Sequence, residues 1–237
     1  MAAPVGHIFG ALLLLQGHVA EVAEPSAFLA GTSFPDIRYI ADIDRKVTHR
    51  VEKKTLDYVM LANSHFEQGR RFHVWLDHER EKYMREHKAY RFVHDQSFSP
   101  THMLKFIEDH LLFSKLNNFD PEPVFNHIYA EEQAFLIPEK KLMAWHAILK
   151  NYLSPRYLFN FVRYYAAFAE LKKQWDTKKG FFEDLWTNVR TLGFVIYAYV
   201  QIERLSRNEE LRSIIFDFYE QKLPELINNH TLRVSIN

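Results

Sequence analysis

The chain of 237 residues contains no cysteine and only seven glycines. The absence of cysteine excludes disulfides, a thiol nucleophile and a thiolate metal site, so any metal ion must be held by His, Asp, Glu or backbone oxygen. The shortage of glycine argues against loop-rich β folds, and no GxxxxGK[ST] or GxGxxG phosphate-binding sequence occurs. A GxSxG nucleophile elbow is also absent, which disfavours a Ser-His-Asp hydrolase.

The chain also lacks an excess of one charge and a long apolar run. Thirty Lys and Arg residues balance 30 Asp and Glu residues, so no overall field attracts nucleic acid or anionic lipid. The apolar runs at 5–15 and 192–200 are shorter than the roughly 18 residues of a membrane helix. No Lys or Arg precedes Arg38, so the first run is not a typical secretory signal. We expect a soluble, cytoplasmic protein, with secretion left open.

The residues that are abundant favour an all-α, multi-helix globular bundle. Hydrophobic residues make up 47% of the chain and aromatic residues 15%, which is enough for a substantial core. Helical periodicity and proline positions predict helices near 5–22, 56–63, 65–87, 100–116, 140–152, 155–175, 181–206 and 209–222. Ser99-Pro100 and Ser154-Pro155 each resemble an N-cap followed by proline in the first helical turn.

Three segments are expected to be irregular. The first contains Pro25, Gly31 and Ser33, and the last is a frayed tail at 228–237. The proline-containing connection 117–138 divides the chain into a helical metal-site half, 1–116, and a second helical half, 139–237. We expect the two halves to pack as one structural domain, with the second half as a lid, an oligomer contact or simply core.

The sharpest local pattern is His73-x3-Asp77 within the predicted helix 65–87. Residues four apart project from one face of a helix, so an imidazole and a carboxylate lie side by side. Gly69, one turn earlier, lets a metal, a ligand or a neighbouring helix approach closely. Arg70 and Arg71 are candidate contacts for an anionic substrate, although arginines at such positions are commonly solvated.

Three more residues upstream are candidate ligands, and each has a simpler explanation. His7 lies among apolar residues, where it fits a buried core histidine with a polar partner. Asp36 follows Pro35, where a helix N-cap is the plain alternative. His49 lies in a polar stretch and is compatible with simple exposure. An H-x3-D pair also arises by chance, so the joint order of the five residues is the stronger signal.

That order resembles the zinc-dependent phospholipase C-like family, all-helical enzymes related to the zinc-dependent single-strand nucleases. The resemblance covers about the first 110 residues and is carried by His7, Phe34-Pro35-Asp36, Thr48-His49 and Gly69-x3-His73-x3-Asp77. It implies that His7, Asp36, His49, His73 and Asp77 bind zinc, with up to three ions in the family. It further implies that Asp77 is a bridging carboxylate and that Asp36 lies close to the water that attacks the phosphodiester.

The family pattern continues with an H-x3-E pair that this chain lacks in the expected place. His102 and Asp109, seven residues apart on one helix face, are the main substitutes as metal ligands. Weaker candidates are His78, His87, Glu108 and His110. The missing pair favours a site with one or two ions over a site with three.

The donor set and the resemblance together predict a metal-dependent hydrolase of a phosphoester, phospholipid included. Imidazole and carboxylate without thiolate suit Zn, and also Mn, Fe, Ni or Mg. Two alternatives remain open. His94-Asp95 supplies the dyad of an HD-type phosphohydrolase, with His49 or His73 upstream and Asp109 downstream. The second alternative is a non-catalytic helical interaction protein with a vestigial metal site and an aromatic-rich partner surface.

Overall fold

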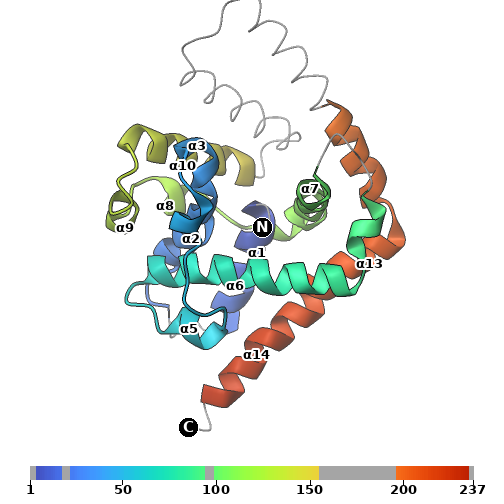
Figure 1. Cartoon of the computed structure of the whole chain (residues 1–237), viewed down its shortest axis with the longest axis horizontal. Helices are drawn as coiled ribbons and strands as arrows, with labels where there is room; N and C mark the ends of the chain where they lie inside the picture. Colours follow the sequence, from blue (N-terminus) through green and yellow to red (C-terminus); the bar gives the residue numbers. More distant parts are fainter. Residues whose placement is uncertain (1–3, 18–21, 94–98, 155–195, 235–237) are drawn as a thin grey trace, which may run out of the picture.

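A computed structural model describes residues 4–17, 22–93, 99–154 and 196–234 of the chain (Figure 1). All regular secondary structure among these residues is helical, so the predicted all-α class is confirmed. The predicted helix 155–175 and residues 181–195 of the next one lie outside the described residues, and residues 196–206 are helical. Among the described residues, no helix combines the length and apolar character that a membrane crossing requires.

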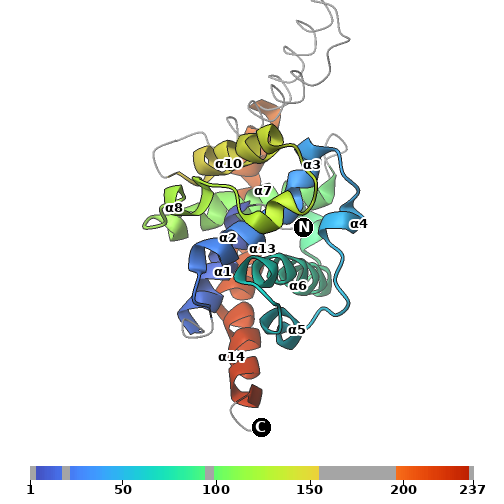
Figure 2. The ribbon, with the colours of Figure 1, turned by 90° about the vertical axis from the view of Figure 1, so that its left-hand side faces the viewer.

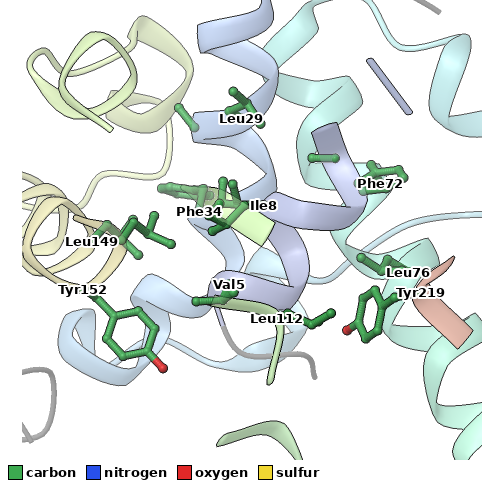
Figure 3. Packing of buried hydrophobic residues seen from close by; sticks show 14 of the residues in the cluster. Val5, Ile8, Leu29, Phe34, Phe72, Leu76, Leu112, Leu149, Tyr152 and Tyr219 are labelled. Carbon is green, nitrogen blue, oxygen red and sulfur yellow. The ribbon is translucent and has the colours of Figure 1, made fainter. Parts of the chain in front are cut away.

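Helix α1 (Pro4–Gly17) is the centre of the fold. It is buried on most of its surface, as expected for a helix that is apolar nearly all round. It packs against α2, α6 and α7 from the first half of the sequence and against α10 and α14 from the second. Figure 3 shows its Val5 and Ile8 among core side chains from several of these helices. Both halves of the chain therefore share one core around α1.

Among the described residues, helices α2 (Pro25–Ser33) and α6 (His65–Glu86) form the most extensive contact between two elements. A Cβ atom on Gly31 would lie 1.9 Å from the carbonyl oxygen of Phe66, and one on Gly69 would lie 1.9 Å from the carbonyl oxygen of Phe28. The two helices thus meet backbone to backbone. Our expectation of an irregular segment here is wrong, because Pro25 occupies the first turn of α2 and Gly31 serves packing.

Short elements connect α2 to α6 and α6 to α7. They are η2 (Phe34–Ile37), α3 (Arg38–Ala41), α4 (Arg45–Thr48), α5 (Leu56–Met60) and η3 (Ala89–Phe92). The α3 helix ends at Asp42, whose φ of 59° is left-handed, and the chain turns there into α4. The Asp44 side chain caps α4 by accepting a hydrogen bond from the Lys46 amide. These turns bring the segment 34–49 alongside α6.

The middle of the chain is more regular than predicted. Helix α7 (Pro100–Leu112) begins at the predicted proline, although the Ser99 side chain makes no capping hydrogen bond, and η4 (Phe113–Leu116) follows it. The connection 117–138 contains the short helices α8 (Glu122–Phe125) and α9 (Ala130–Gln133), before α10 (Glu139–Leu153). A buried pair, Glu132 Oε1 and His146 Nε2 at 2.8 Å, joins α9 to α10.

The last described elements are α13 (Glu209–Asp217), a π-helical turn η5 (Phe218–Lys222) and α14 (Leu223–Val234). The expectation of a frayed tail is wrong for residues 228–234, because they continue α14, which packs on α1 and α5 (Figure 2). Earlier in this helix, Leu223 and Ile227 are buried. Tyr219 also donates a hydrogen bond to Glu108, which pairs with the fully buried Arg80. This network joins η5, α6 and α7.

Candidate metal centre

The five residues predicted as ligands converge from four elements. His7 comes from α1, Asp36 from η2, His49 from the end of α4, and His73 and Asp77 from successive turns of α6. The Asp77 carboxylate lies among the three histidines. Its oxygens are 3.5 Å from His7 Nε2, 3.7 Å from His73 Nε2 and 4.0 Å from His49 Nε2. We call these five residues the His/Asp cluster.

The cluster contains two overlapping sets of three donors. In one set, donor atoms of His7, His73 and Asp77 all lie within 4.8 Å of one another. In the other, donor atoms of Asp36, His49 and His73 satisfy the same limit. His73 belongs to both sets, and its ring stacks on that of His7 with the centroids 3.7 Å apart.

The imidazole rings of His73 and His49 are oriented by contacts at Nδ1. The Nδ1 of His73 lies 2.8 Å from the Thr32 carbonyl oxygen, which can only accept, so Nδ1 carries the hydrogen. The Nδ1 of His49 lies 2.9 Å from the Thr48 hydroxyl. In both residues, Nε2 is the nitrogen that faces Asp77. Metal-binding histidines commonly hold their second nitrogen in this way.

Four buried donor atoms in the cluster have no hydrogen-bond partner among the described residues. They are the Nε2 atoms of His7, His49 and His73 and the Oδ1 atom of Asp36. A buried polar group without a partner costs about 1–3 kcal/mol, and folded proteins contain few of them. These four atoms belong to residues that could hold a metal ion.

Burial sets the protonation of the imidazoles. It lowers the pKa of His73 well below its usual value. Burial, with the positive charge of Arg45 as the next contribution, lowers the pKa of His49 to about 3. Both rings are therefore neutral at physiological pH, which is the form that binds metal.

The two carboxyl groups of the cluster differ. Burial raises the pKa of Asp36 to about 6. Burial alone would also raise the pKa of Asp77, but the groups around it, His7 and His73 among them, hold it well below its usual value. Arg45 adds a further contact, with Nη2 3.4 Å from Asp77 Oδ2. Asp77 is thus a carboxylate throughout the physiological range.

Asp109 and His102 lie outside both sets of donors. The Asp109 carboxylate accepts hydrogen bonds from the Val5 amide at 3.2 Å, the Gly6 amide at 2.9 Å and the Tyr152 hydroxyl at 2.8 Å. It therefore satisfies the first turn of α1 and fixes the helix that carries His7. Burial raises the pKa of Asp109 to about 7. His102 is half-buried, and burial lowers its pKa.

The weaker candidates also lie apart from the two sets of donors. Glu108 pairs with Arg80 in the core. His78, His87 and His110 are exposed, and His110 Nε2 lies 3.5 Å from Glu203 Oε1. The HD-type dyad, His94-Asp95, lies outside the described residues.

Arg70 and Arg71, predicted as substrate contacts, are engaged within the protein. Both bind the Glu67 carboxylate. Arg70 also donates to the carbonyl oxygens of Thr48 at 2.8 Å and Arg50 at 3.0 Å, the residues on either side of His49. Arg70 therefore fastens the His49 backbone to α6. Arg71 donates instead to the Tyr58 carbonyl oxygen at 2.9 Å.

Sequence reasoning missed Thr32 and Arg45. Thr32 contributes a main-chain carbonyl oxygen, which every residue type carries, so the residue type at position 32 gives no signal of this role. Arg45 precedes His49 by four residues, one helical turn, and that spacing was a usable clue.

No protein-family model matches the chain, and comparisons with curated proteins and with solved structures found no match. The function is therefore inferred from the geometry of the His/Asp cluster.

Proposed function

We propose that the protein is a metal-dependent hydrolase of a phosphoester, phospholipase C-like in its chemistry, with zinc bound by the His/Asp cluster. The observation that carries the proposal is the set of four buried donor atoms without a hydrogen-bond partner among the described residues, three of which lie within 4.0 Å of the Asp77 carboxylate. The resemblance in ligand order supports the same assignment. The class of phosphoester, lipid or soluble, is open in this proposal.

The donor chemistry fits zinc. Three imidazoles and two carboxylates, without thiolate, match the nitrogen and oxygen ligands that zinc takes at about 2.0–2.2 Å. Donor atoms spread over 4.8 Å need to move inward slightly to reach such distances. His73 belongs to both sets of donors, and its Nδ1 is engaged by Thr32, which leaves Nε2 as its ligand atom. One nitrogen serves one ion, so this arrangement favours a single ion between the two sets.

Each residue then has a defined task. A bound zinc ion lowers the pKa of water from 15.7 to about 7 and offsets charge on the phosphoryl group. His7, His49 and His73 would supply the nitrogen donors, from α1, the end of α4 and α6. Asp77 supplies the central carboxylate. The Asp36 carboxylate, from the short η2 element, orients the attacking water and accepts its hydrogen bond.

The test compares the zinc content of the wild type with that of His73→Ala, after exposure to zinc and removal of the excess. We expect wild type to retain zinc and His73→Ala to lose it while keeping its helical circular dichroism. His78→Ala is the matched control, because His78 lies on the same helix but is exposed. Equal zinc in wild type and His73→Ala would contradict the proposal.

Catalysis is tested separately by turnover of a generic bis-phosphodiester. We expect zinc-dependent cleavage that His73→Ala lacks. Zinc retention without turnover of the diester or of phospholipid vesicles would leave a metal-binding helical protein without hydrolase activity. Preference for a phosphomonoester would favour the HD-type alternative.

A further inference from the structure

Arg45 connects the His/Asp cluster to solvent. Its side chain is 51% exposed, whereas the Asp77 side chain that it contacts is only 6% exposed. The distance of 3.4 Å between Arg45 Nη2 and Asp77 Oδ2 is longer than the 2.7–2.9 Å of a strong charge-assisted hydrogen bond. The guanidinium group is therefore close enough to act on the cluster but loosely held.

Arg38 adds a second positive charge on the cluster. It begins α3, two residues after Asp36, and its guanidinium carbon lies 4.0 Å over the Tyr39 ring. Its charge acts on both Asp36 and His49, as that of Arg45 does on His49. Two guanidinium groups from neighbouring short helices thus act on the same group of donors.

A metal ion adds positive charge to the cluster. Without it, the carboxylates of Asp36 and Asp77 lie close to the charges of Arg38 and Arg45. A divalent cation bound to the carboxylates adds two positive charges to these guanidinium groups. An anion with several oxygen acceptors then offsets the added charge.

We propose that Arg45 is the residue that recognises the substrate, by binding the phosphate oxygens of a phosphoester at the zinc-loaded cluster. The inference rests on the proposed function and adds a residue outside the cluster that binds the phosphate oxygens of the substrate. A guanidinium group can bind two oxygens of a phosphate at once. The single contact between Arg45 Nη2 and Asp77 Oδ2 does not use this capacity. Metal binding to Asp77 weakens that contact and frees the guanidinium group to face the incoming anion.

The experiment measures the binding of inorganic phosphate by titration calorimetry to the full chain, zinc-loaded and freed of excess zinc. We expect phosphate to bind the loaded wild type at least tenfold more tightly than the metal-free protein. Arg45→Gln should weaken phosphate binding about tenfold without changing the zinc content. Lys46→Gln is the matched control, because Lys46 is an exposed cation in the same turn of α4.

The outcomes separate the two proposals. If no zinc binds, both are overturned. If zinc binds and Arg45→Gln matches wild type or Lys46→Gln in phosphate affinity, the role of Arg45 is overturned and the zinc site stands. Titration with soluble glycerol phosphate and sedimentation with phosphatidic acid vesicles then identify the source of the phosphate. The ligand class that supplies the phosphate should bind Arg45→Gln more weakly than wild type. If neither ligand binds this variant more weakly, the inference is contradicted.

Discussion

The His73 imidazole donates its Nδ1 hydrogen to the carbonyl oxygen of Thr32, 2.8 Å away. This bond joins α6 to α2 and leaves the Nε2 lone pair facing Asp77, 3.7 Å away. The tautomer needed for metal binding is therefore set by the main chain before any ion arrives. A carbonyl oxygen in this position cannot be removed by substituting Thr32, so the orientation of His73 is insensitive to the residue type at that position.

The bonds of Arg70 to the carbonyl oxygens beside His49 predict a role in metal affinity. Lysine has a single ammonium group and cannot bind two carbonyls and a carboxylate at once. We expect Arg70→Lys to lower zinc affinity by about 10- to 100-fold, as loss of an orienting partner commonly does. Competition with a chromogenic chelator measures the change. Arg71→Lys should change zinc affinity far less, because the Arg71 guanidinium binds the Tyr58 carbonyl oxygen, away from His49. Equal losses of zinc affinity in the two variants would refute the role of Arg70.

Glu67 predicts a pH dependence of stability. Burial alone would raise its pKa, but the hydrogen bonds and charges of Arg70 and Arg71 outweigh burial and leave the pKa below its ordinary 4.5. A carboxyl group with a lowered folded-state pKa stabilises the fold fully above the unfolded value and loses that contribution as pH falls. We expect Glu67→Gln to cost about 2 kcal/mol near pH 7.

The cost of Glu67→Gln should shrink as pH falls below 4.5. Urea unfolding of wild type and variant at several pH values measures it. A difference in free energy of unfolding that stays constant from pH 7 to pH 3 would show that the ion pairs of Glu67 do not contribute.

The contact between α2 and α6 predicts that position 69 tolerates no side chain. A Cβ atom there would lie 1.9 Å from the Phe28 carbonyl oxygen and 2.7 Å from the Thr32 nitrogen, and backbone cannot move aside cheaply. We expect Gly69→Ala to destabilise the fold by about 3 kcal/mol, measured by thermal or urea unfolding. Gly17→Ala is the control, because its Cβ would meet only Ile227 at 3.8 Å. Similar stabilities for the two variants would be inconsistent with the close crossing.

Zinc should stabilise the native state by mass action. A ligand at about 100 times its Kd, bound only by the folded protein, adds about 2.7 kcal/mol. For a chain of this size, we expect the melting temperature to rise by roughly 5–10 °C. A chelator should reverse the rise, and His73→Ala should not show it. If zinc does not change the melting temperature of the wild type, this result would argue against a metal site formed by the fold.

The sequence predicted the parts of the site that depend on local helix geometry or on the order of the candidate ligands along the chain. The spacing of His73 and Asp77 fixes their common face on any helix. The approach of His7, Asp36 and His49 depends on tertiary packing, and only the resemblance in order suggested it. Asp109 looked like a ligand from its helix face, but its acceptors are taken by the first turn of α1. No local pattern reveals such a long-range partner.

The fold was predicted best where periodicity is strong and worst where single residues mislead. Helix α6 matched the expected span within a residue at its C-terminal end, because its apolar and charged faces alternate regularly. Helix α2 was missed because proline and glycine usually end helices. Its Pro25 instead starts the helix and its Gly31 makes room for a neighbour. Such exceptions depend on contacts 35 or more residues away in the sequence.

The crossing at Gly31 and Gly69 has a further consequence for ion selectivity. Asp36 follows α2 within three residues, and His73 lies one turn after Gly69 on α6. The spacing of the two main-chain segments that carry these residues is therefore set by helices in direct backbone contact, and rotamers adjust only the positions of the donor atoms. For the zinc site that we propose, we expect such a frame to disfavour large ions such as Ca²⁺, which need longer bonds and more ligands.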